Sequence, residues 1–105
     1  LQHSSGWNFG PDKYDTMSVK DILTFFKKYF PHLRWNFKKE VQFKETKILL
    51  LDTTKAKKYL NWKSKIKIEE ALKLTIDWNF ANKNGQDMNN FTNYQIKNYL
   101  KSSKL

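Results

Sequence analysis

Cysteine is absent from the 105-residue chain, and its absence excludes three classes of site. Without thiols the protein has no disulfide scaffold, no cysteine nucleophile and no zinc site built on cysteine. Long apolar runs are also absent. The longest run, residues 48–51, has four residues, whereas a helix needs roughly 20 to span a bilayer. The first five residues lack the basic segment and apolar core of a signal peptide. We therefore expect a soluble, cytoplasmic protein with no membrane partner.

Glycine and histidine are scarce, and their positions exclude several common catalytic motifs. The three glycines stand at positions 6, 10 and 85, so no glycine-rich loop can cradle a phosphate. The two histidines, His3 and His32, are isolated, and the sequence has no HExxH, HxxxH, DxD or GxSxG motif. We therefore assign no catalytic residue and no metal ligand within this chain.

Positive charge is abundant, but it is almost entirely lysine. The net charge is +10, and 19 of the 20 basic residues are Lys, with Arg34 the exception. Proteins that read nucleic-acid grooves favour arginine for its planar, bidentate fork. The lysines are spread from Lys13 to Lys104 with no run longer than two. We interpret the charge as a compositional bias and consider a nucleic-acid partner unlikely, while keeping a lysine-rich nucleic-acid-binding module as the alternative function.

The first half of the chain predicts short strands around one helix. Residues 7–9 form an aromatic strand candidate closed by a turn at residues 10–12. Ser18, with Asp21 three positions on, predicts the N-cap of a helix over residues 18–30 that Pro31 ends. Apolar residues alternate over residues 34–43, the period of a strand, and residues 48–51 are a second strand candidate.

The second half predicts three helices. Asp52 or Thr53 can cap a helix that runs to about Leu60. After an extended piece at residues 65–68, apolar spacing predicts a helix over residues 69–82, ended by Asn84-Gly85, and a last helix over residues 90–101. The inward-facing residues are expected to include Tyr59 and Leu60 in the first of these helices and Phe91, Ile96, Tyr99 and Leu100 in the last. The fold class expected is α/β, a small mixed α+β unit dominated by helix.

Four segments in register resemble one family over residues 7 to about 100. They are Trp7-Asn8-Phe9-Gly10-Pro11 with the following Ser18-Val19; Glu45, Leu49, Leu51-Asp52 and Lys55-Ala56; Leu60-Asn61-Trp62-Lys63 followed by the residues 68–72 and 75–78; and Asp87-Met88, Thr92, Gln95-Ile96 and Tyr99. These segments are similar to the C-terminal part of extended short-chain dehydrogenase/reductases that act on nucleotide sugars. The similarity is greatest to the CDP-glucose 4,6-dehydratase family.

The resemblance implies that residues 1–105 are a single substrate-binding domain fragment with an ordered core at about 7–101. It would be the C-terminal substrate-binding domain of such an enzyme, without the Rossmann domain. The family is an NAD-dependent lyase that converts CDP-glucose to CDP-4-keto-6-deoxyglucose for surface polysaccharide. In that family the cofactor and the catalytic Tyr/Lys pair belong to the N-terminal region. We therefore expect the parent enzyme to bind NAD and this fragment to bind none. The expected partners are CDP-glucose and the missing N-terminal Rossmann domain. The parent is expected to be a homo-oligomer, and this chain alone is expected to show no turnover.

One site residue is carried over from the resemblance. Glu45 matches the acidic residue near the nucleotide ribose in related enzymes, so it is the candidate substrate-binding residue; its other interpretation is a surface carboxylate between Lys44 and Lys47. The sequence departs from the family with Lys44 in place of His, Thr46 in place of Ala, Asn61 in place of Gly and Ser64 in place of Pro. Asn61 can still adopt the left-handed conformation of a glycine at a helix end.

Two alternatives remain beside this assignment. Tyr59 and Lys63 have the spacing of the family's catalytic pair, but no nucleotide-binding strand and glycine loop precede them, so we interpret Tyr59 as a core residue. The aromatics Trp7, Phe9, Trp35, Trp62 and Trp78 could stack on bases, although their amphipathic settings favour packing. A fragment of another nucleotide-sugar epimerase or dehydratase would keep the fold and change only the substrate.

Overall fold

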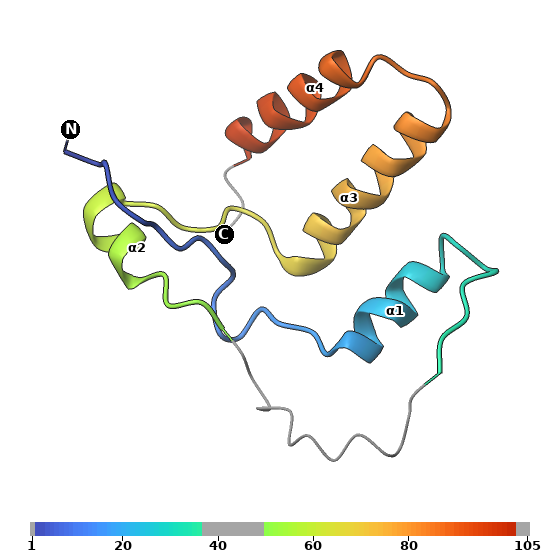
Figure 1. Cartoon of the computed structure of the whole chain (residues 1–105), viewed down its shortest axis with the longest axis horizontal. Coiled ribbons are helices and arrows are strands. Elements are labelled where there is room, and N and C mark those ends of the chain that lie inside the picture. The colour runs from blue at the N-terminus through green and yellow to red at the C-terminus, as the bar shows by residue number, and fades with distance from the viewer. Residues whose placement is uncertain (1, 37–49, 103–105) are drawn as a thin grey trace.

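Four helices make up the regular structure of the chain. The computed structural model describes residues 2–36 and 50–102, and within these ranges it contains α1 (Val19–Lys27), α2 (Thr54–Leu60), α3 (Ile68–Lys83) and α4 (Met88–Lys101) (Figure 1). No strand occurs in the described ranges. The expected mixed α/β class is therefore not supported, and the described chain is helical.

The strand predicted at residues 7–9 does not form. Its side chains instead contact α2 and the chain that follows it: the Trp7 ring lies beside the Lys55 ammonium, and the Phe9 ring meets the Trp62 ring. The extended piece expected at residues 65–68 is irregular as far as Lys67, and Ile68 already belongs to α3. The strands expected at residues 34–43 and 48–51 lie largely outside the described residues, and their described ends, 34–36 and 50–51, are irregular.

The helix starts follow local capping chemistry. The Ser18 hydroxyl accepts a hydrogen bond from the Asp21 backbone N–H at 3.1 Å and donates to the Asp21 carboxylate at 2.7 Å, which confirms the predicted N-cap of α1. The helix ends at Lys27, three residues earlier than predicted. Because a residue that precedes proline avoids the helical region, Pro31 shortens the last turn before it.

The helix α2 confirms both of its predicted boundaries. Asp52 accepts from the Thr54 backbone N–H at 2.9 Å at its start. At its end Asn61 is the C-cap in the left-handed conformation, with φ 50° and ψ 35°. The Asn that stands where the resembled family has Gly therefore does adopt the conformation expected of it.

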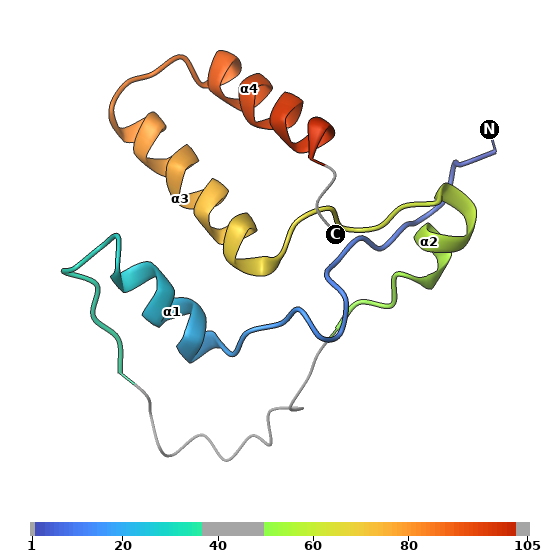
Figure 2. The ribbon, with the colours of Figure 1, turned by 180° about the vertical axis from the view of Figure 1, so that it is seen from behind.

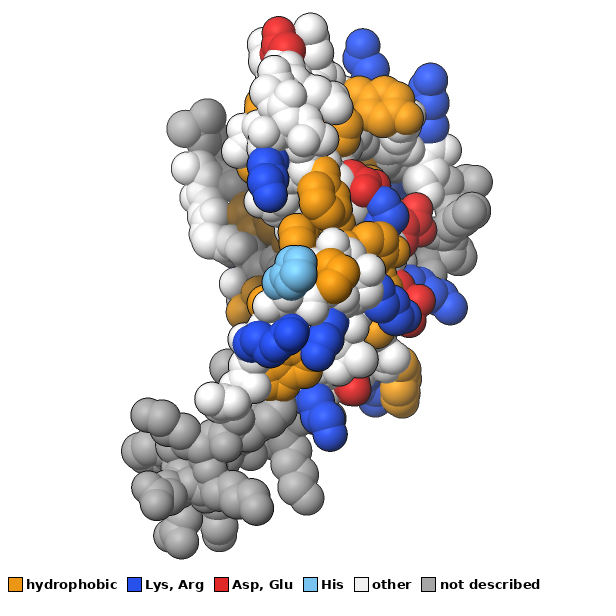
Figure 3. Space-filling model, turned by 90° about the vertical axis from the view of Figure 1, so that its right-hand side faces the viewer, with side chains coloured by type: hydrophobic (Ala, Val, Ile, Leu, Met, Phe, Trp, Pro, Cys, Tyr) orange, Lys and Arg blue, Asp and Glu red, His pale blue; other side chains and the backbone are white. Residues whose placement is uncertain are grey.

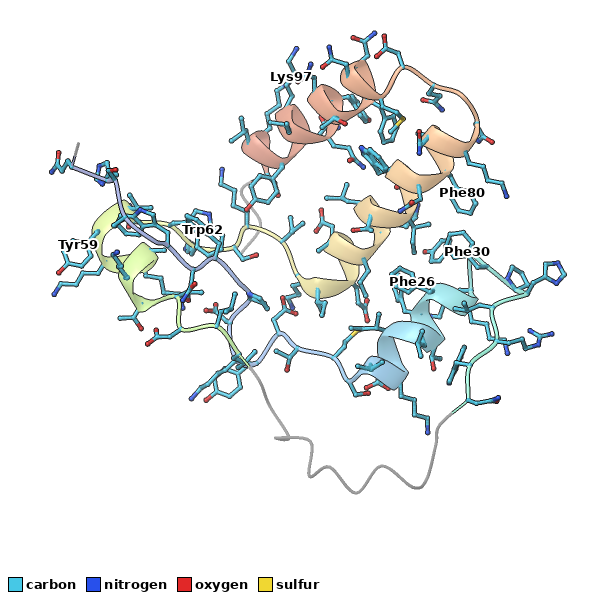
Figure 4. The ribbon with its side chains drawn as sticks, in the orientation of Figure 1. Phe26, Phe30, Tyr59, Trp62, Phe80 and Lys97 are labelled. Atoms are coloured by element: carbon cyan, nitrogen blue, oxygen red, sulfur yellow. The ribbon has the colours of Figure 1, made fainter. Side chains whose placement is uncertain are left out.

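The helices α3 and α4 form a hairpin around Gly85, whose φ is +74°. The Trp78 indole N–H donates to the Thr92 hydroxyl at 3.0 Å, and the Gln95 amide donates to the Leu74 carbonyl at 2.9 Å. On the other side of α3, Phe80 stacks on Phe30 with ring centroids 5.0 Å apart. A ring contact therefore joins α3 to the chain that follows α1, and Figure 4 shows Phe30 beside Phe80.

The N-terminal segment runs beside α2 and the chain that follows it (Figure 2). The Lys55 ammonium donates to the Ser5 hydroxyl and the Gly6 carbonyl at 2.8 Å each and stands 4.3 Å from the Trp7 ring centroid. The Lys57 ammonium pairs with Asp12 at 2.6 Å. These contacts hold segments that are about 45 to 50 residues apart in sequence.

Few apolar residues are fully covered. Among the described residues, only Ala56, Ile76 and Ala81 are buried hydrophobics, whereas large apolar side chains remain exposed on every side of the helices. Ile96 is 50% and Leu100 is 64% exposed, so the expectation that they face inward is wrong. Among the described helices, α3 is the one that packs along α4, and these two side chains lie off the face that α3 covers. No described helix has both the length and the apolar character to cross a membrane.

Candidate functional site

A hollow of about 450 Å³ lies where the N-terminal segment meets the start of α3 and the end of α4. We call it the aromatic hollow. Its lining comes from four parts of the chain: Phe9, Gly10 and Pro11; Asp15; Trp62, Ser64, Ile66, Ile68 and Ala71; and Tyr99. The volume falls within the range of small-molecule sites, and most of the lining is apolar or aromatic.

Trp62 is the largest wall of the aromatic hollow, and local structure fixes its place. The left-handed turn at Asn61 lets the Trp62 backbone N–H donate to the Ala56 carbonyl at 3.2 Å. The Trp62 ring then meets the Phe9 ring edge to face, with centroids 5.1 Å apart and planes at 75°. In Figure 4, Trp62 lies between the N-terminal segment and the chain that leads to α3.

Asp15 supplies the carboxylate of the aromatic hollow. Lys67, the residue before α3, cannot cap a helix N-terminus, and the Asp15 Oδ2 atom accepts from the Ile68 backbone N–H instead, at 2.9 Å across 53 residues. The side chain is half-buried. Ser64 adds a hydroxyl, which donates to the Ile66 carbonyl at 2.9 Å.

Two further hollows adjoin the aromatic one. The first, of about 270 Å³, shares Asp15, Ser64 and Ile66 with it and adds Asp12, Tyr14 and Lys67. The second, of about 500 Å³, shares Asp12 and Tyr14 with the first and adds lysines and hydroxyls, among them Lys13, Lys57, Thr53 and Thr54. A groove thus passes from an aromatic end to a lysine-bearing end, formed by the shared lining residues of the three hollows.

The charges of the lysine-bearing end are partly paired. Lys57 binds Asp12, whereas the Lys13 ammonium stands 4.7 Å from the Tyr14 ring centroid. Hydrogen bonds from the Thr54 side chain and backbone, with a smaller contribution from Lys57, lower the pKa of Asp52 below its ordinary value of 3.8. Asp52 therefore stays ionised at neutral pH and adds a negative charge beside the lysines of this end.

The structure describes Tyr59 but not Glu45, the two residues that the sequence analysis discussed as possible site residues. Glu45 lies outside the described residues, so its prediction stays untested. Tyr59 is 61% exposed on α2 and points away from Trp62 in Figure 4, so its interpretation as a core residue is wrong. In the described ranges no three His, Asp or Glu side chains gather as metal ligands.

Asp15 was missed by sequence reasoning because its role depends on a distant helix start. No motif surrounds it, and its partner Ile68 is far away in the chain. Trp62 was named among the aromatics whose settings favour packing over base stacking, and its ring does pack against Phe9.

Comparison of the chain with protein-family models, with curated proteins and with solved structures finds no match.

Proposed function

We propose that the chain is the sugar-nucleotide-binding part of a CDP-glucose 4,6-dehydratase-like enzyme, which converts CDP-glucose to CDP-4-keto-6-deoxyglucose with NAD. One observation carries the proposal. Three of the four segments that resemble this family, represented by Phe9, Trp62 and Tyr99, are far apart in sequence and line one hollow. The remaining segment, which runs from Glu45 to Ala56, contributes Leu51 and Asp52 to the adjoining end of the same groove.

The groove suits the parts of a sugar nucleotide. A nucleobase is planar and stacks on aromatic rings, as the aromatic hollow offers with Trp62 and Phe9. A diphosphate is anionic: in the adjoining hollows Lys67 and Lys13 attract it, Asp52 repels it, and Asp12 is paired with Lys57. The aromatic hollow adjoins the lysine-bearing end of the groove. This arrangement supports a ligand in which phosphates follow a base.

The sparse core supports the assignment to a larger protein. Large apolar side chains such as Val19, Tyr94 and Leu100 are 61 to 68% exposed. Apolar surface of this kind is favourably buried against another domain or subunit. In this proposal the covering surface is the Rossmann domain of the parent enzyme.

In this proposal the catalytic groups belong to the N-terminal region of the parent enzyme. NAD would supply hydride transfer there, and the residues of this chain do not fit the cofactor. The described chain has no strand that leads through a glycine-rich turn into a helix. The role left to this chain is to bind and orient the substrate.

The direct test is a titration of the chain with CDP-glucose, followed by NMR chemical shifts. We expect weak, millimolar binding with shifts concentrated at Trp62, Tyr99 and the residues around Asp15. Trp62→Ala should abolish these shifts, because it removes the stacking wall. Trp35→Ala removes a half-buried tryptophan outside the groove and should leave binding unchanged. If CDP-glucose at about 10 mM shifts no resonance, the binding role is wrong.

A turnover assay separates binding from catalysis. With CDP-glucose and NAD, the purified chain should form no 4-keto-6-deoxy product, because the proposal assigns the cofactor and the catalytic pair to the N-terminal region of the parent enzyme. Product formation by the pure chain would show that the catalytic machinery is present here and would overturn the division of roles.

A further inference from the structure

We propose that Asp15 selects a cytosine ring in the aromatic hollow by accepting a hydrogen bond from the exocyclic amino group. This inference rests on the proposed function, because it names the residue that distinguishes one nucleotide sugar from another. It differs from the Glu45 assignment, which concerns the ribose.

The Asp15 carboxylate is held in place by the fold. One of its oxygens, Oδ2, accepts from the backbone N–H of Ile68, the first residue of α3, at 2.9 Å. The other oxygen accepts from no side chain or backbone group in the described ranges, and Asp15 belongs to the lining of the aromatic hollow. A half-buried carboxylate with one oxygen fixed presents the second oxygen in a defined direction.

The chemistry of the carboxylate decides which ring it favours. An ionised carboxylate only accepts hydrogen bonds. Cytosine carries an amino donor at the position where uracil carries a carbonyl acceptor, and Asp and Glu accept from that amino group in base recognition. A uracil carbonyl facing Asp15 would place two acceptors together, so the hollow favours cytosine over uracil.

The surrounding charges argue for a neutral ring rather than a cation. Three aromatic walls and a carboxylate can also enclose an ammonium group. However, the Lys65 ammonium already stands 5.7 Å from the Tyr99 ring centroid and donates to the Leu100 carbonyl, and Lys67 lines the adjoining hollow beside Asp15. A cationic ligand would meet these two positive charges, whereas they would not repel a neutral ring.

The test compares CDP-glucose with UDP-glucose by NMR titration of the wild-type chain and of Asp15→Asn. The wild-type chain should bind CDP-glucose at least about fivefold more tightly. In Asp15→Asn the amide oxygen can still accept from Ile68, while the amide N–H₂ group donates and suits a uracil carbonyl. The preference should therefore disappear or reverse. Asp77→Asn removes a carboxylate that pairs with Lys73 outside the groove and should keep the wild-type preference.

The outcomes separate the two proposals. Equal binding of both nucleotide sugars by the wild-type chain would overturn the role of Asp15 and leave the proposed function standing; this ratio decides the matter even if Asp15→Asn does not fold. An unchanged preference in a folded Asp15→Asn would overturn it as well. Binding of neither nucleotide sugar would remove the proposed function and the inference together. Displacement of CDP-glucose by tetramethylammonium but not by cytidine would identify the hollow as a cation site and overturn the inference.

Discussion

Asn61 shows how one residue positions the groove. Its left-handed backbone, at φ 50°, ends α2 and turns the chain so that Trp62 meets Phe9. Left-handed conformations cost other non-glycine residues roughly 1–2 kcal/mol, whereas Asn tolerates them through local hydrogen bonding. The identity of residue 61 therefore affects both the stability of the helix end and the wall of the aromatic hollow.

Replacing Asn61 tests this role. Asn61→Ala should lower the free energy of unfolding by about 1 kcal/mol, because alanine pays the left-handed penalty without compensation. Asn61→Gly should change it by only a few tenths of a kcal/mol, since glycine adopts this conformation freely. Urea unfolding followed by tryptophan fluorescence measures both variants. Equal stability of the alanine and glycine variants would contradict the assignment of strain to this position.

At the scale of the elements, α3 contacts α4 on one side and the chain that follows α1 on the other. Its residue Ile76 is 1% exposed, Trp78 and Leu74 hold α4 through hydrogen bonds, and Phe80 stacks on Phe30. The helix α4, in contrast, has no fully buried side chain and leaves Ile96 half exposed. An isoleucine side chain should therefore contribute more to the free energy of unfolding on α3 than on α4.

Matched isoleucine substitutions on the two helices measure this difference. Ile76→Val removes a methylene from the buried face and should cost about 0.5–1.5 kcal/mol of unfolding free energy. Ile96→Val makes the same chemical change at an exposed position and should stay within about 0.5 kcal/mol of the wild type. Circular dichroism during urea unfolding provides the comparison. A larger loss for Ile96→Val would mean that α4 presents its other face to α3.

For the whole molecule, the positive charge is spread among internal contacts and surface positions. Lys55, Lys57 and Lys65 each contact a carboxylate, a hydroxyl or a carbonyl of a distant part of the chain, and Lys73 pairs with Asp77 one turn along α3. On the face drawn in Figure 3, lysines alternate with apolar and acidic side chains rather than forming an unbroken basic stripe. This distribution favours a small anionic ligand over a polymer of phosphates.

A salt-controlled titration tests this view of the charge. Labelled duplex DNA and single-stranded RNA should show no binding to the chain at about 150 mM salt, because scattered and paired lysines neutralise few adjacent phosphates. Fluorescence anisotropy is the measurement, with a repeat at low salt to detect non-specific attraction. Micromolar binding that falls steeply with added salt would instead favour the nucleic-acid-binding module.

The sequence by itself determined the helices and their ends. The Ser18–Asp21 cap, the Asp52–Thr54 bond and the Asn61 and Gly85 turns act between residues at most a few positions apart, so a local pattern contains their full cause. Only the tertiary structure decided which faces were covered and where a ligand could sit. Tyr59 and Ile96 satisfy a helical pattern yet stay exposed, because burial requires a neighbouring element that periodicity cannot supply. The groove unites Phe9, Asp15, Trp62 and Tyr99 across most of the chain, and its carboxylate is fixed by a helix start 53 residues away.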